Sequence, residues 1–394
     1  MGSASETPLP DSNPASRPVS ALRQFILKIA SRCDLACDYC YVYRMADSSW
    51  SSQPRTMSPR ILHRTAQRIG EHAGAHGLDA VSVVFHGGEP LLAGEAYIAQ
   101  AARALRASLP DTVALDLRVQ THAGLLDERL LTVLAEHGIA VGISLDGARE
   151  HHDRHRLRVD GTGSYDRTAA GLRLLTEGDY RHLFSGLLCV VDLANDPVEV
   201  YEALLAFAPP AVDFLLPHGN WSNPPPGRAP SPDAPYGAWL VAAFDRWYSA
   251  PRQETAVRLF QEVIHLHLGG QSVSEQVGLS PVAFVVVDTD GALQQVDTLK
   301  SVRPGGPATG MHVDTHTMDD VLAHPDIQAR QLGLAGLCGT CRDCRVVRVC
   351  GGGAYVHRYH PDNGFANPSV YCLDLQHLIT HVMARVDADL GRRP

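Results

Sequence analysis

The sequence predicts an α/β fold: an open, partial barrel of six parallel strands, followed by a cysteine-rich region. Up to residue 216, short apolar runs typical of buried strands alternate with stretches of helical periodicity. Strands that alternate with helices in this way form successive parallel βαβ units. A loop rich in proline and glycine at residues 217–235 ends the alternation, and five of the nine cysteines then fall within residues 338–372.

The expected strands and helices of the barrel run in order along residues 25–216. Strands are expected at residues 25–30, 80–85, 115–120, 139–145, 183–191 and 212–216. Helices are expected at residues 58–77, 95–108, from 127 onward, at 165–176 and at 197–207. The first helix has Ser58 as its cap and Pro59 in its first turn, which is typical of a helix start. Chemistry in such barrels lies at the C-terminal ends of the strands.

Fewer elements are expected beyond the loop. We expect helices at residues 236–249 and 255–268, a β-hairpin of residues 281–287 and 293–296, and an amphipathic helix at 373–390. The hairpin turns at Asp290-Gly291, a favoured turn sequence. The pattern predicts a disordered tail at 1–20, a barrel at 21–235, bridging helices and a hairpin at 236–297, and a cysteine-rich domain with the C-terminal helix at 298–394.

Composition and charge exclude several classes of protein. The 394 residues carry a net charge of −9 and contain no long basic run, so nucleic acid is not an expected partner. No apolar stretch is long enough to cross a membrane, and the first 20 residues lack the apolar core of a signal peptide. Nine clustered cysteines fit metal ligands in a reducing compartment better than a disulfide framework. We therefore expect a soluble, cytoplasmic protein.

Three cysteines follow the first expected strand in the pattern Cys33-x3-Cys37-x2-Cys40. Three thiolates on one loop can hold three corners of a four-iron cluster, which leaves one iron free to bind a small molecule. Closed structural metal sites use four protein ligands instead. From this stretch alone, a zinc knuckle with its fourth ligand elsewhere remains an alternative.

This spacing, with Tyr39 before the third cysteine, resembles the signature of radical S-adenosylmethionine (SAM) enzymes. The resemblance implies that the open iron chelates SAM, that an electron from the cluster releases a 5′-deoxyadenosyl radical, and that Tyr39 packs near the adenine. The cofactor carries the chemistry, and the protein positions it. One βα unit later, His86-Gly87-Gly88-Glu89-Pro90 matches the family motif that holds the SAM amino group.

Three further positions match the family. The resemblance implies that Ser144 contacts the SAM ribose or carboxylate and that Arg156 pairs with the methionine carboxylate, which a planar guanidinium suits. Gln120 opens Gln120-Thr121-His122, where relatives usually have Gln-Thr-Asn, so a contact through His122 is less expected. We expect the histidine-rich stretch at residues 152–156 to be a solvated loop without a metal.

The C-terminal cysteines resemble the auxiliary-cluster (SPASM) domain of radical SAM peptide maturases. Cys341-x2-Cys344-x5-Cys350, followed by Cys372, matches four ligands of one auxiliary cluster. Four thiolates would ligate a [4Fe–4S] cluster fully, which favours electron transfer or a structural role. A four-cysteine zinc site is the alternative. Cys338 is an extra thiol that could join this site or serve as an alternative ligand.

The chain departs from the full SPASM pattern at two positions. Val296 stands where a Gly-x4-Cys element starting at Gly291 would place a cysteine, and Ala354 stands four residues after Cys350, where another is usual. A second auxiliary cluster of the usual form is therefore not expected. Asp297 matches an aspartate that serves some SPASM enzymes as a base, and it is our candidate catalytic residue; the alternative is a carboxylate at the hairpin end.

The sequence is identified by resemblance as a radical SAM/SPASM peptide maturase of the FxsB-type branch, through residues 294–300, 350–359 and 364–372. The resemblance implies a partial (β/α)6, TIM-like radical SAM barrel with a SPASM-like iron–sulfur domain. It implies a ribosomal precursor peptide as substrate and an external electron donor such as ferredoxin or flavodoxin. The implied reaction abstracts a β-hydrogen and joins that carbon to an aromatic ring as a three-residue cyclophane.

Alternatives to the cyclophane reaction fall into two classes. Other radical SAM reactions on peptides include thioether formation, β-hydroxylation, epimerisation and oxidation of serine or cysteine. A non-catalytic iron–sulfur or zinc protein is the alternative of a different class, and it would not cleave SAM. Metal analysis separates iron–sulfur clusters from the zinc alternative, because two four-iron clusters bring about eight irons per chain.

Overall fold

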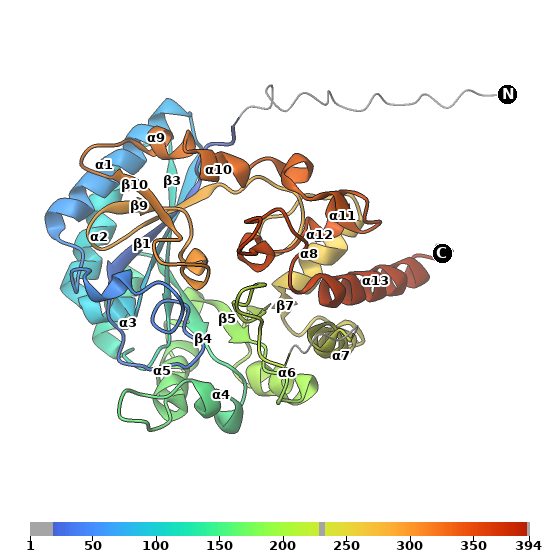
Figure 1. The fold of residues 1–394 in the computed structure, drawn as a ribbon. Helices are drawn as coiled ribbons and strands as arrows, with labels where there is room; N and C mark the ends of the chain where they lie inside the picture. The colour runs from blue at the N-terminus through green and yellow to red at the C-terminus, as the bar shows by residue number, and fades with distance from the viewer. Residues whose placement is uncertain (1–18, 228–232, 392–394) are drawn as a thin grey trace.

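The computed structural model describes residues 19–227 and 233–391, and almost all of the tail expected at 1–20 lies outside these residues. Its centre is one ten-stranded sheet in the order β10-β9-β8-β1-β2-β3-β4-β5-β6-β7 (Figure 1). Strands β1 to β6 lie side by side in chain order, and each pairs in parallel with the next. They are β1 (Gln24–Ala30), β2 (Ala80–Gly87), β3 (Ala114–Thr121), β4 (Ile139–Ser144), β5 (Phe184–Val190) and β6 (Ala211–Leu215). The predicted α/β fold with six parallel strands is confirmed.

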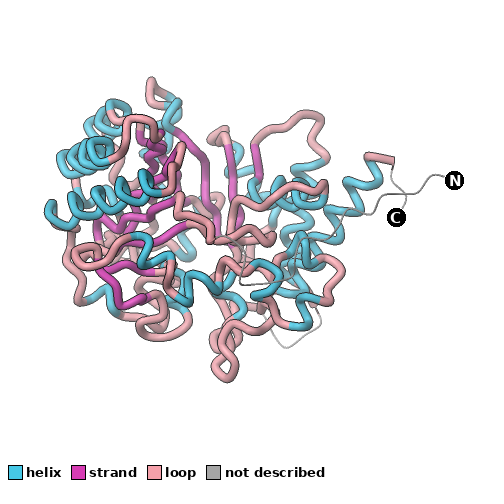
Figure 2. The backbone as a smooth tube through the Cα atoms, turned by 90° about the horizontal axis from the view of Figure 1, so that it is seen from above, coloured by secondary structure: helices cyan, strands magenta, loops and turns pink. Residues whose placement is uncertain are grey.

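Helices connect successive strands and lie on the outer side of the sheet, as the view from above shows (Figure 2). The connecting helices are α1 (Pro59–Ala75), α2 (Glu95–Ser108), α3 (Glu128–Glu136), α5 (Tyr165–Glu177) and α6 (Pro197–Leu205). The Ser58 side chain accepts a hydrogen bond from the Ile61 N–H, as expected of its capping position. Alternate residues of β1, Phe25, Leu27 and Ile29, are fully buried in the core.

The sheet extends beyond the predicted barrel at both of its ends. At one end, β8 (Phe284–Val287) pairs in parallel with β1, and the expected hairpin of β8 and β9 (Ala292–Gln294) continues into β10 (Ala308–His312). At the other end, β7 (Ala256–Val257) pairs with β6. The helix expected from residue 255 is wrong at its start, because pairing with Ala211 and Val212 draws residues 256–257 into the sheet. The helix α8 (Arg258–His267) begins only after them.

The histidine-rich segment is a helix and not the solvated loop that its composition predicts. Helix α4 (Arg149–His155) buries His151 and His152. The His152 ring accepts a hydrogen bond from the Asp146 N–H at 3.3 Å and bonds the Ser164 hydroxyl at 3.0 Å. Burial lowers the pKa of His152 to about 3, so the ring is neutral. It packs between Asp146 and Ser164, after the end of β4.

The C-terminal part packs three helices beside the barrel: α7 (Pro235–Tyr248), α8 and α13 (Cys372–Asp389) (Figure 1). The Gly237 N–H donates to the Asp374 carboxylate at 3.0 Å, which joins α7 to α13. The remaining short helices are α9 (Met318–Leu322), α10 (Pro325–Ala329), α11 (Gly339–Arg342) and α12 (Val347–Cys350). In the described ranges, no helix is both long enough and apolar enough to span a membrane.

Candidate active site

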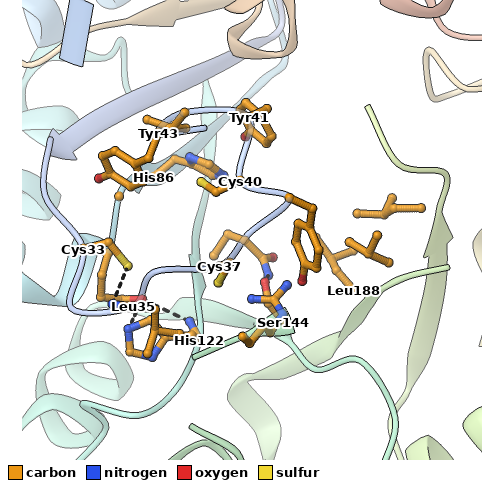
Figure 3. A pocket seen from close by; sticks show the side chains of 18 of the residues that line it. Cys33, Leu35, Cys37, Cys40, Tyr41, Tyr43, His86, His122, Ser144 and Leu188 are labelled. Atoms are coloured by element: carbon orange, nitrogen blue, oxygen red, sulfur yellow. Dashed lines mark hydrogen bonds and ion pairs between the residues drawn. The ribbon is translucent and has the colours of Figure 1, made fainter. Parts of the chain in front are cut away.

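A cavity of about 190 Å³ lies where the parallel strands end. Gly87, Thr121, Ser144, Val190 and Leu215 line it, and each is the last residue of its strand, from β2 to β6. Because the carboxyl ends of parallel strands meet at one edge of the sheet, motifs far apart in sequence converge there. The cavity is lined by all three cysteines of the first cluster and by all seven residues predicted to bind SAM: Cys33, Cys37, Cys40, Tyr39, Gly87, Gly88, Glu89, Gln120, Ser144 and Arg156. Figure 3 shows the side chains of Cys33, Cys37, Cys40 and Ser144 around this cavity.

The cysteine loop is fastened to the segment that carries Arg156. The Ala36 N–H donates to the Leu157 carbonyl at 2.7 Å, and the Asp38 N–H donates to the His155 carbonyl at 3.2 Å. Burial raises the pKa of Cys37 to about 12, although the nearby Arg156 guanidinium opposes the shift. Without a metal the Cys37 side chain is therefore a thiol. Three thiols on one loop fit three ligands of a four-iron cluster, and their binding to iron would release protons.

Arg156 is held by Asp146 beside the ring of Tyr39. The Arg156 Nε donates to Asp146 Oδ2 at 2.8 Å, and the Tyr39 hydroxyl donates to the same oxygen. The guanidinium carbon lies 5.6 Å from the centre of the Tyr39 ring, and the Val190 N–H donates to Asp146 Oδ1 at 3.0 Å. Within residues 19–227 and 233–391, only Nε of Arg156 has an acceptor. Its two Nη atoms are therefore free to bind a carboxylate in the cavity.

Glu89 joins the ends of β2 and β3 with its buried carboxylate. Oε1 accepts hydrogen bonds from the Leu91 N–H at 3.0 Å and the Thr121 hydroxyl at 2.7 Å. Oε2 accepts the His122 N–H at 3.0 Å. A ligand ammonium that approached Glu89 would therefore share oxygens that already fix the backbone of the site.

Gly87 and Gly88 are required by the close approach of the cysteine loop. A Cβ on Gly87, whose φ is +134°, would lie 1.9 Å from the Ala30 carbonyl oxygen, and one on Gly88 would lie 2.3 Å from that of Arg32. Both distances are far below contact, so no other residue fits without moving the backbone. The sequence suggests that the two glycines let the backbone come close to a ligand. The structure shows in addition that they let the backbone come close to the carbonyl groups of Ala30 and Arg32.

A contact between Asp34 and His122 was not anticipated from the sequence. The His122 Nε2 and the Asp34 carboxylate are 2.8 Å apart, and the His122 Nδ1 accepts the Gly124 N–H at 3.0 Å. Since Nδ1 is an acceptor, Nε2 carries the proton that Asp34 accepts. The pair ties the cysteine loop to the end of β3. No local sequence signal identifies it, because the two residues are 88 positions apart.

Asp297, the predicted catalytic residue, lies in a buried charge cluster and does not line the cavity. Lys28 Nζ is 3.0 Å from the Asp288 carboxylate and 3.3 Å from Asp297 Oδ1. Lys28 on β1 is the register partner of His86 on β2, and His86 lines the cavity. Although burial disfavours its charge, Asp297 and Asp288 raise the pKa of Lys28. The Asp297 Oδ2 is buried without a hydrogen-bond partner.

A second cavity, of about 290 Å³, brings together four cysteines of the C-terminal region: Cys341, Cys344, Cys350 and Cys372. Cys338 does not line it. A set of four thiols around one cavity fits a fully ligated [4Fe–4S] cluster and also a zinc ion.

The two positions at which the SPASM pattern would place further cysteines lie in apolar packing. Val296 belongs to a small core with Leu299, Val302 and Val356, and Ala354 packs against it. The donor set for a second auxiliary cluster of the usual form is therefore replaced by apolar contacts, and these residues do not fit such a cluster.

Replacing Arg358 by methionine is expected to lower the iron content from about eight to about four irons per chain. The Arg358 guanidinium donates to the carbonyls of Gly351, Gly352 and Gly353 at 2.8, 3.1 and 2.6 Å. It thereby holds the turn after Cys350, in which all three glycines have positive φ. Iron and sulfide analysis after anaerobic reconstitution measures the effect. The exposed Arg348, on α12, is the control: R348M should keep about eight irons. Equal iron content in R358M and R348M would contradict a role of Arg358 in holding the turn after Cys350.

The chain is similar to a family model and to several curated proteins. Residues 27–203 match the model of the Radical SAM superfamily. The chain is 26% identical over 283 residues to a cysteine-type anaerobic sulfatase-maturating enzyme of Clostridium perfringens (strain 13 / Type A), covering 70% of this chain and 74% of that protein. It is 27% identical over 188 residues to a serine-type enzyme of Klebsiella aerogenes, covering 47% of this chain and 44% of that protein.

Two solved structures share the fold. The structure of native anSMEcpe with bound AdoMet aligns with a TM-score of 0.81 at 21% identity, over 93% of this chain and 99% of that one. Streptococcus suis SuiB bound to the precursor peptide SuiA aligns with a TM-score of 0.60 at 14% identity, over 90% of this chain and 76% of that one. The chain is thus a radical SAM enzyme with SAM and [4Fe–4S] clusters as cofactors, whose residues 27–203 match the Radical SAM superfamily and which is related to the anaerobic sulfatase-maturating enzymes.

Proposed function

We propose that the chain is a cytoplasmic maturase that crosslinks a ribosomally made precursor peptide, joining an aromatic side chain to a nearby β-carbon as a three-residue cyclophane. The observation that carries the proposal is one cavity that combines the cysteine trio and Arg156 with a wall of aromatic and imidazole rings. An external donor such as ferredoxin or flavodoxin would supply the electron for SAM cleavage.

The part of the cavity that carries the three cysteines suits SAM and its cluster. In the proposal Cys33, Cys37 and Cys40 hold the cluster, which with SAM supplies a 5′-deoxyadenosyl radical for hydrogen abstraction. The free Nη atoms of Arg156 bind the methionine carboxylate, and Glu89, with backbone groups of Gly87 and Gly88, receives the amino group. The Gln120 amide donates a hydrogen bond to the Ser144 hydroxyl at 3.0 Å. In the proposal these two side chains contact the SAM ribose or carboxylate, and Tyr39 packs near the adenine.

The wall of the cavity that carries most of its rings suits an uncharged aromatic side chain. Its lining comprises Tyr41, Tyr43, His86, Leu215, Leu216 and His218. The rings of Tyr41 and His218 meet edge to face, with centres 4.9 Å apart. Burial lowers the pKa of His218 to about 4, so the ring is neutral. A third ring could pack against this pair with the edge-to-face geometry that aromatic groups prefer.

Closing the crosslink requires loss of one proton and one electron from the attacked ring. We assign the proton to Asp297, whose unpartnered Oδ2 belongs to the Lys28 charge cluster behind His86. Cys341, Cys344, Cys350 and Cys372 would hold an auxiliary [4Fe–4S] cluster, which would supply an acceptor for the electron. Proton acceptance by Asp297 further requires that the substrate reach it past His86.

The relatives support a peptide substrate and point to a second candidate reaction. SuiB is solved with a precursor peptide, and anSMEcpe is solved with peptides named Cp18Cys and Kp18Cys. The sulfatase-maturating relatives are named by cysteine type and serine type. Oxidation of a peptide cysteine or serine is therefore the second candidate.

The mass of the precursor peptide encoded beside this gene, after anaerobic co-expression, tests the proposal. A loss of two hydrogens, about 2 Da per crosslink, is expected, with fragmentation absent across three residues that include an aromatic one. C33A, which removes one iron ligand, should leave the mass unchanged. The same mass loss confined to a cysteine or serine would favour oxidation, whereas a gained oxygen, or solvent deuterium without mass change, would indicate hydroxylation or epimerisation.

A further inference from the structure

The C-terminal region has five cysteines for a cavity that four of them line. Cys338 is the fifth. It is the N-cap of α11, and Cys341 is the third residue of the same helix. Side chains three positions apart along a helical turn are neighbours, so the two thiols lie on the same side of this turn. Cys338 lies close to the Cys341 thiol, and Cys350 and Cys372 lie near that thiol as well. Cys341 is thus both a member of the cavity and the partner of a thiol outside it.

We propose that Cys338 and Cys341 form a reversible disulfide when the auxiliary site lacks its metal, and that Cys338 protects the site instead of binding metal. The pair has the Cys-x-x-Cys spacing found in disulfide-exchanging proteins. Its closure would occupy Cys341 and leave the three other thiols of the cavity unmodified. Reduction would return Cys341 to the cavity without loss of a ligand.

Exposure determines the order of the two chemical steps. Cys338 is partly exposed, whereas Cys341 is buried, with 8% of its surface accessible. The Cys338 thiolate therefore attacks a small-molecule disulfide such as oxidised glutathione, forming a mixed disulfide and releasing one reduced glutathione. The Cys341 thiolate then displaces the second glutathione. Two electrons and two protons pass from the cysteine pair to the oxidised glutathione, which leaves as two thiols.

The experiment uses the full chain with and without metal. Reconstituted protein and chelator-treated protein are each incubated anaerobically with oxidised glutathione, alkylated and digested with trypsin. Cleavage after Arg330 and Arg342 gives a peptide of residues 331–342 that contains Cys338 and Cys341 and no other cysteine. In the metal-free protein this peptide should be unalkylated and about 2 Da lighter than the dithiol form, since closure removes two hydrogens. In the metal-loaded protein Cys338 should remain free of a bond to Cys341.

Two comparisons decide the inference without any measurement of enzyme activity. C338S should hold as much iron as the wild type after a first reconstitution. After one cycle of metal removal, glutathione oxidation, reduction and reconstitution, C338S should regain clearly less iron than the wild type. A lower iron content in freshly reconstituted C338S would make Cys338 a ligand and overturn the proposal. Bonding of Cys341 to Cys344, seen as a link to the tryptic peptide of residues 343–345, or stable glutathione on Cys338, would overturn it too.

Discussion

Replacing Arg156 by leucine is expected to abolish formation of 5′-deoxyadenosine and to lower the free energy of unfolding by about 3–5 kcal/mol. The stability loss follows from Asp146, which is 4% exposed and would keep its charge in the interior without a cation. The loss of SAM binding follows from the loss of the two Arg156 Nη atoms, which bind the methionine carboxylate of SAM in our proposal. Denaturant unfolding, SAM titration and 5′-deoxyadenosine analysis measure the three quantities.

Two control variants separate stability from cofactor binding. Arg154 lies two positions before Arg156, on α4, pairs with Asp192 at 2.6 Å and is 41% exposed. R154L should therefore cost less than about 1 kcal/mol and leave SAM cleavage intact. The double variant R156L/D146N removes both charges, so it should recover most of the lost stability but none of the SAM affinity. Wild-type SAM affinity in R156L would contradict the proposal that Arg156 binds the methionine carboxylate of SAM.

The sequence predicted the barrel and the convergence of its motifs because both depend on local patterns. Apolar runs and helical periodicity mark β1 to β6, and the topology of parallel strands then brings Cys33, Gly87 and Ser144 to one edge. What each side chain contacts there was predicted only through family resemblance. The structure adds the hydrogen bonds of Glu89 and Asp146, which no spacing in the sequence indicates.

The features that the sequence did not predict depend on pairing between distant segments. Lys28 and Asp288 are 260 positions apart and meet because β8 joins the sheet beside β1. The two-residue strand β7 is too short for periodicity to reveal, and α4 is too polar to be recognised as packed. The apolar core around Val296 was not predicted either. The absence of cysteines from the SPASM pattern indicates that a cluster is missing, but it does not indicate that apolar packing takes its place.

Replacing Lys28 by methionine is expected to lower the free energy of unfolding by about 3–5 kcal/mol, since it leaves two buried carboxylates without a cation. Asp288 is fully buried and Asp297 is 5% exposed. One of the two carboxylates should then take up a proton. If Asp297 is the proton acceptor of our proposal, K28M should still form 5′-deoxyadenosine with the precursor peptide but yield little crosslinked product. The ratio of 5′-deoxyadenosine to product should rise at least tenfold.

Lys300 provides the matched control for the loss of a buried lysine. It is fully buried, pairs with Asp47 at 3.1 Å and lies three positions after Asp297. K300M should therefore destabilise the protein as K28M does but keep the wild-type ratio. The double variant K28M/D288N should regain product relative to K28M, because Asp297 then no longer shares its site with a second carboxylate. An equal rise of the ratio in K300M would attribute the effect to loosened packing, whereas an unchanged ratio in K28M would exclude Lys28 from the proton step.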